Sequence, residues 1–190
     1  MNRPIHPSRR GMLAGGAALG LLPFLVNGCT QEMTPGDARH RGVPLRTLGA
    51  NEAAILARLG EVLLPGADEA GIVHFVDHHL SVPPEQTLLM IRYMDVPPPF
   101  GDFYRAGLAA LDRYSRTAHT LGFPDLAAES AQQVVGALGR QQPEGWRGPP
   151  SQLLYFVTRS DAVDVVYGTQ EGFARLGLPY MPHIEPEQAW

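Results

Sequence analysis

Six stretches of the chain repeat apolar residues every three or four positions, which is the spacing of one face of an α-helix. In the first stretch, Ile55 and Leu59 fall on one stripe before Pro65-Gly66 ends the pattern. The stretches cover residues 51–64, 68–80, 83–94, 102–118, 125–138 and 151–166. No run shows sustained strand alternation, and no hairpin is expected. The pattern therefore predicts an all-α fold, a compact bundle of about five to six helices with short connections.

The C-terminal stretch from Tyr167 to Trp190 differs, because it is rich in apolar side chains but interrupted by glycine and proline. Such a sequence does not form one long helix. We expect an extended, irregular arm that either wraps its own domain or docks in a partner groove, where aromatic side chains act as anchors. The residues expected to bind a partner are Tyr167, Gly168, Phe173, Leu178, Pro179, Tyr180 and Trp190.

The first residues have the layout of a secretory signal, in which a basic segment precedes an apolar one. Residues 2–10 are basic and contain no acid, and residues 11–26 are uncharged. The apolar segment is too short and too rich in glycine for a membrane-spanning helix. The adjacent Arg9 and Arg10 resemble the twin-arginine export signal, whose pathway carries folded proteins. We therefore expect a periplasmic protein exported by the twin-arginine translocase.

Cys29 is the single cysteine, which excludes an internal disulfide and any cysteine-cluster metal site within this chain. The residues before it, Leu25-Val26-Asn27-Gly28, resemble a lipobox, although Asn27 departs from that pattern. Two outcomes stay open. Either Cys29 is lipidated and anchors the protein at a membrane surface, or cleavage nearby leaves a free or discarded thiol.

These features divide the chain into four parts. They are a twin-arginine signal peptide with its lipobox-like end at residues 1–29, a linker without periodicity at 30–48, a helical domain at 49–166 and a C-terminal docking arm at 167–190. The whole chain has 190 residues, which fits one globular domain after the leader and linker are removed.

Charge excludes one class of partner. The formal net charge is −4, and all 15 basic residues are arginines. A mildly acidic chain without a basic stripe lacks the electrostatic footprint for DNA or RNA, so no nucleic-acid partner is expected.

Chemistry-bearing residues do not form a recognised catalytic pattern. His74 and His78 are four residues apart and share a helix face, but a zinc site needs three or four ligands. The serines lack a nucleophile elbow, and the glycines form neither a P-loop nor a dinucleotide fingerprint. We therefore expect no catalytic, cofactor-binding or metal-binding residue in this chain. A metal enzyme built on the two histidines is the alternative reading.

Three motifs resemble the gluconate 2-dehydrogenase subunit 3 family, in the order in which that family has them. The first is Pro65-Gly66-Ala67-Asp68-Glu69-Ala70-Gly71-Ile72-Val73 with Phe75-Val76-Asp77, the second is Phe103–Asp112, and the third is Val166-Tyr167-Gly168 leading through Gly172-Phe173 to Leu178-Pro179. The twin-arginine leader is also typical of this family. Together these motifs cover most of the chain.

The resemblance implies a role. Members are non-catalytic small subunits of periplasmic flavoprotein dehydrogenases that act on sugars, sugar acids and polyols. The large subunit is of the glucose–methanol–choline (GMC) type, holds FAD and lacks its own leader, so Arg9 and Arg10 would export both chains. A cytochrome c subunit carrying haem c often accepts the electrons. No activity of this chain alone is expected, and the alternative is a stand-alone exported helical lipoprotein that binds a small ligand.

Overall fold

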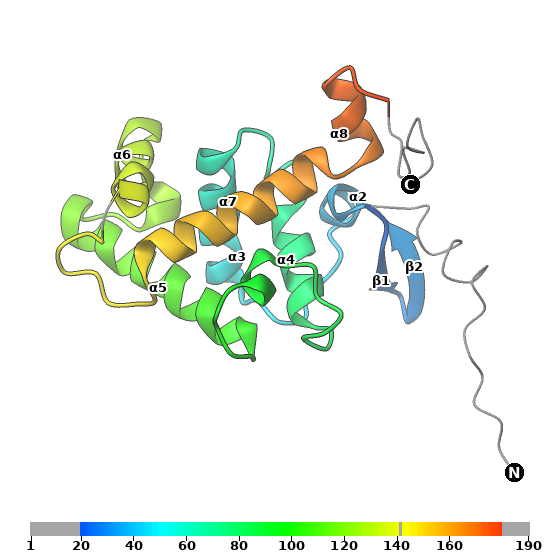
Figure 1. The fold of residues 1–190 in the computed structure, drawn as a ribbon, viewed down its shortest axis with the longest axis horizontal. Coiled ribbons are helices and arrows are strands. Elements are labelled where there is room, and N and C mark those ends of the chain that lie inside the picture. The colour runs from blue at the N-terminus through cyan, green and yellow to red at the C-terminus, as the bar shows by residue number, and fades with distance from the viewer. Residues whose placement is uncertain (1–19, 141, 180–190) are drawn as a thin grey trace, which may run out of the picture.

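The computed structural model describes residues 20–140 and 142–179, which form a bundle of α-helices with a small β-hairpin at one end (Figure 1). Within these residues the helices are α2 (Pro35–His40), α3 (Ala50–Leu63), α4 (Ile72–Leu80), α5 (Phe100–His119), α6 (Ala128–Arg140), α7 (Ser151–Tyr167) and α8 (Gln170–Arg175). The shorter elements are strands β1 (Leu22–Val26) and β2 (Cys29–Met33) and the 3-10 turns η1 (Met90–Tyr93) and η2 (Phe123–Asp125). The prediction of a helical fold is confirmed.

Helix α7 crosses the bundle and contacts α3, α4, α5, α6, α8 and η1 (Figure 1). Leu154 and Val157 on this helix are fully buried in the main apolar core. The side chain of Leu154 packs directly on α5 at Gly107, where an added Cβ would lie 2.7 Å from Leu154 Cδ1. A larger residue at Gly107 would displace the Leu154 side chain in the core, so this glycine makes room for Leu154 between the two helices.

The third predicted helix, over residues 83–94, is wrong. Only Met90–Tyr93 are helical there, and they form a 3-10 turn. Backbone N–H groups in this stretch donate to side chains instead of to carbonyls one turn earlier: Leu89 N–H donates to Thr87 Oγ1 at 3.3 Å and Met90 N–H donates to Asp161 Oδ1 at 2.9 Å. These acceptors replace the helical ones, so the apolar side chains are buried by an irregular backbone.

The expectation that no hairpin forms is also wrong. Strands β1 and β2 pair antiparallel, with Val26 opposite Cys29. The two residues between them have positive φ, 50° at Asn27 and 79° at Gly28. Asn-Gly is the sequence that best adopts this two-residue turn, whose twist matches that of the flanking strands. The signal was therefore present in the sequence, inside the segment that we interpreted as a leader.

Residues 30–48 hold ordered elements rather than the expected linker. They contain β2, α2 and the buried side chains of Val43 and Leu48. Pro35 lies against the start of α4, where an added Cβ on Gly71 would be 2.2 Å from the Pro35 carbonyl oxygen. Gly71 has a φ of 85°, so both its conformation and its space require glycine.

The carboxylate of Asp77 on α4 holds the end of the segment 30–48 in place. Asp77 is only 4% exposed. Backbone N–H groups of Arg46, Thr47 and Leu48 each donate to it at 2.8 Å. Three donors satisfy a buried carboxylate that would otherwise destabilise the fold. Residues 46–48 have no periodic pattern, and they are ordered because the Asp77 carboxylate on α4 accepts their backbone N–H groups.

The C-terminal arm is partly helical. Thr169 caps the short helix α8, and its hydroxyl accepts the N–H of Gly172 at 3.0 Å. Residues 180–190 lie outside the described part of the chain, so the structure tests only the first half of the expected arm. Among the described residues, no helix has the length and apolar character needed to cross a membrane.

We predict that Asp77→Asn lowers the free energy of unfolding by about 1–3 kcal/mol, because the amide NH2 group would face a buried N–H donor. Urea denaturation measures this change. Asp95→Asn, at an exposed position, is the control and should shift stability by less than about 0.5 kcal/mol. Equal stability of Asp77→Asn and the wild type would show that residues 46–48 are held without the carboxylate.

Candidate partner-docking site

An apolar groove of about 310 Å3 lies beside the C-terminal end of α7. The apolar side chains that line it come from β1, α2, α4, the η1 region and α7, and they are Leu22, Pro35, Phe75, Leu88, Met90, Tyr93 and Val165. Gly20, Asp164, Gly168 and Thr169 also line it, so one carboxylate stands among the apolar side chains. Because these residues lie far apart in the sequence, only the folded bundle forms the groove.

Two large apolar side chains of the groove are open to solvent. Leu88 is 49% exposed and Tyr93 is 63% exposed. The guanidinium carbon of Arg92 lies 5.7 Å from the centre of the Tyr93 ring, at cation–π distance. Exposed apolar and aromatic side chains beside an apolar concavity are typical of a surface that another protein covers. The groove is therefore the candidate docking site.

The wall that carries Leu88 and Tyr93 is fixed by Asp161, which is fully buried on α7. Its Oδ1 accepts the N–H of Met90 at 2.9 Å, and its Oδ2 accepts a short hydrogen bond from the Tyr104 hydroxyl on α5. One carboxyl thus joins α5, α7 and η1. The groove is shaped from inside the core, by a contact that none of its exposed residues makes.

Burial changes the acidity of this pair. It raises the pKa of Asp161 to about 7, and the hydrogen bonds from Met90 and Tyr104 only partly oppose that effect. Burial and the neighbouring Asp161 raise the pKa of Tyr104 well above its ordinary value. Tyr104 therefore stays a hydrogen-bond donor, and the charge on Asp161 changes near neutral pH.

The structure brings only part of the expected partner-binding set to the groove. Gly168 lines it, and Tyr167 is half-buried against the main core. Phe173 is half-buried on α8, whereas Leu178 and Pro179 are exposed and do not line the groove. Tyr180 and Trp190 lie outside the described residues.

The sequence interpretation missed Leu88, Met90 and Tyr93 as groove residues. The helical stripe predicted over 83–94 places Leu88 on the apolar face and does not include Met90 or Tyr93, so it gives no indication that Leu88 and Tyr93 face solvent. The available signal was the proline on both sides, at Pro83-Pro84 and Pro97-Pro98-Pro99, which favours an irregular segment.

The histidines on α4 pack within the apolar core or at its edge. His74 Nε2 lies 3.0 Å from the carbonyl oxygen of Val43, and the His78 and His79 rings pack edge-on at 5.1 Å between centroids. Burial lowers the pKa of His78, and it lowers the pKa of His79 to about 4. Both rings are therefore neutral at pH 7. Within residues 20–140 and 142–179, no group of three or more His, Cys, Asp or Glu side chains is placed to hold a metal ion.

The two N-terminal sites differ in what the structure describes. Cys29 opens strand β2 with its thiol free and exposed. Arg9 and Arg10 lie before the first described residue, so their role in export stays a prediction.

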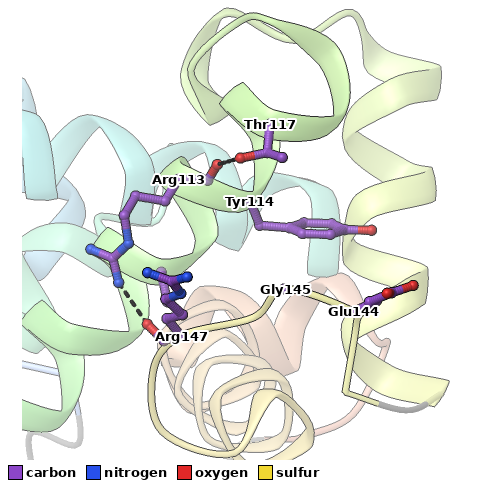
Figure 2. A pocket seen from close by; sticks show the side chains of 7 residues that line it. Arg113, Tyr114, Thr117, Glu144, Gly145 and Arg147 are labelled. Atoms are coloured by element: carbon purple, nitrogen blue, oxygen red, sulfur yellow. Dashed lines mark hydrogen bonds between the residues drawn. The ribbon is translucent and has the colours of Figure 1, made fainter.

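A second, more polar pocket of about 380 Å3 lies between α5 and the loop that follows α6 (Figure 2). Arg113 donates to the carbonyl oxygen of Arg147 at 2.6 Å, which ties the loop to α5. Figure 2 shows Tyr114 on the side of the pocket near Glu144, away from these arginines.

The structure is that of a small helical protein with an apolar groove on its surface. A comparison with protein-family models matches residues 50–184 to the gluconate 2-dehydrogenase subunit 3 family, and the chain belongs to this family. Comparisons with curated proteins and with solved structures found no match. The match covers every helix from α3 to α8, whereas the hairpin and α2 precede it. The chain is thus an accessory subunit of the gluconate 2-dehydrogenase subunit 3 type. Membership of this family supports a dehydrogenase as the kind of protein with which it assembles.

We predict that the difference in melting temperature between the wild type and Asp161→Asn depends on pH. An acid whose pKa is raised by folding binds more protons in the native state, so its contribution to stability falls as pH rises from about 4 to about 7. The wild type should therefore lose stability relative to Asp161→Asn over this range, as measured by thermal denaturation.

The buried histidines His78 and His79 have lowered pKa values, so their contribution to stability rises with pH. Because both proteins contain these histidines, their contribution cancels in the difference between the melting temperatures of the wild type and Asp161→Asn. Asp125→Asn, at an exposed position, should follow the wild type at every pH. A constant difference between the wild type and Asp161→Asn would contradict a raised pKa at Asp161.

Proposed function

We propose that this chain is the non-catalytic small subunit of a periplasmic, FAD-dependent dehydrogenase of the GMC type that oxidises a sugar, polyol or other alcohol. The large subunit holds FAD, and a third subunit with haem c accepts the electrons. The observation that supports this proposal most directly is the apolar groove, with Leu88 and Tyr93 exposed at its edge, on a chain that belongs to this family.

The groove supports docking for a physical reason. Transfer of apolar surface from water contributes roughly 25 cal/mol per Å2, so a partner that covers Leu88 and Tyr93 gains stability from the contact. A tyrosine beside a pocket is a typical energetic centre of an interface, because it buries a rigid ring and keeps its hydroxyl at the wet rim. Gly168 and Thr169 bring the start of the C-terminal arm to the same surface.

Export of the complex depends on Arg9 and Arg10 in this proposal. The flavin-bearing subunit binds the groove in the cytoplasm, folds with FAD and crosses the membrane with the small subunit. This order agrees with a twin-arginine leader, because that route carries folded cargo. The small subunit then contributes export, folding and stability, while the chemistry belongs to its partner.

We predict that Leu88→Arg weakens binding to the flavin subunit at least tenfold, equivalent to about 1.4 kcal/mol, because it places a charge in an apolar contact. Pull-down titration of the purified subunits measures the loss. Leu121→Arg is the matched control, since Leu121 is also 49% exposed but does not line the groove. If both variants bind equally well and melt like the wild type, the groove is not the docking site.

We predict that replacing Arg9 and Arg10 together by lysine keeps the dehydrogenase activity of a co-expressed, leaderless flavin subunit in the cytoplasm. Periplasmic activity should fall at least tenfold, because the translocase no longer recognises the leader. Activity assays on separated cell fractions measure the distribution. Unchanged periplasmic activity would mean that the flavin subunit does not travel with this chain.

A further inference from the structure

We infer that the hairpin of β1 and β2 belongs to the mature protein, that the leader is cleaved after Gly20, and that Cys29 keeps a free thiol instead of a lipid. This inference rests on the export proposed above. It assigns a cleavage site for a signal peptidase that recognises small residues, nine residues before the cysteine of the lipobox-like sequence.

The turn of the hairpin occupies the residues on which a lipobox depends. Asn27 and Gly28 both adopt positive φ, and Val26 pairs with Cys29 across them. Asn27 departs from a lipobox but is a preferred residue for this turn. The local sequence therefore fits a folded hairpin better than a peptidase substrate that must be extended at the membrane.

The hairpin is packed onto the body of the protein through β1. Phe24 is 5% exposed and shares an apolar cluster with Met33, Ala38 and Val43. Its ring centroid lies 6.2 Å from that of His74 and 5.6 Å from that of His78, on α4. Cleavage before Cys29 would remove this ring and expose the cluster, together with the histidines beneath it.

The hairpin also continues directly into elements that hold the chain to α4. Strand β2 ends at Met33, and the hydroxyl of Thr34 caps α2 by accepting the N–H of Asp37 at 3.0 Å. Arg39 on α2 pairs with Asp68 at 2.7 Å and with Glu69 at 3.0 Å. Cys29 is therefore a residue within a continuous folded unit, with no free linker between it and α2.

A leader that ends at Gly20 has the proportions of a signal peptide. The uncharged segment shortens to residues 11–20, which lies within the roughly 7–15 residues of such apolar segments. Ala18-Leu19-Gly20 supplies the small-x-small sequence that signal peptidases recognise. The first strand begins two residues later, at Leu22, so this cleavage leaves β1 complete.

The test is the intact mass of C-terminally tagged protein, co-expressed with its flavin subunit and recovered from separated periplasmic and membrane fractions. We expect a periplasmic chain that begins at Leu21 and gains one maleimide, at Cys29. A chain that begins at Cys29 with acyl groups, or one cut between residues 21 and 28, would overturn the inference and leave the export proposal intact. A full-length chain confined to the cytoplasm would overturn both.

Two variants separate the cleavage sites. Ala18→Phe should block processing, because a large residue replaces a small one in the recognition sequence, whereas Cys29→Ala should be processed and bind the flavin subunit like the wild type. The reverse result, with Cys29→Ala unprocessed and Ala18→Phe unaffected, would establish lipid processing at Cys29 and overturn the inference. Processing of both variants would overturn cleavage after Gly20.

Discussion

The position of the candidate docking surface depends on one buried carboxyl group, that of Asp161. It receives the Tyr104 hydroxyl and the Met90 N–H, so α5, η1 and α7 meet at a single polar point inside an apolar core. A buried acid without such partners would destabilise the fold, which makes the three elements interdependent. The exposed groove is thus a consequence of an internal hydrogen-bond arrangement, and the residues that a partner would touch are placed by residues that it would not touch.

Helices α3 to α7 were predictable because each repeats apolar residues over several turns. Helices α2 and α8 were not predicted, because each has only six residues and is too short to repeat such a pattern. The structure of residues 83–94 was not predictable in this way. Their apolar residues do recur at helical spacing, but side-chain oxygens of Asp161 and Thr87 accept their backbone N–H groups in place of helical carbonyls. Residues 46–48 show the same effect with Asp77 as acceptor. In both places a side chain far away in the sequence decides the local backbone, and no local pattern carries that information.

The candidate site was predictable only where it coincides with the start of the C-terminal arm, at Gly168. Its exposed residues Leu88 and Tyr93 lie in the misassigned segment, and the arrangement that makes them a surface is tertiary. The hairpin differs, because the Asn27-Gly28 signal is local and was hidden by the interpretation of the surrounding residues as a leader.

The buried side chains of the described residues form two apolar clusters of very different size. The small cluster contains Phe24, Met33, Ala38 and Val43, and the half-buried Leu22 packs against both clusters. A unit with so few buried contacts opens locally at a lower free energy than the whole domain. Because Leu22 also lines the groove, a partner that binds there would shift the equilibrium away from the opened hairpin, and by thermodynamic reciprocity an ordered hairpin would bind that partner more tightly.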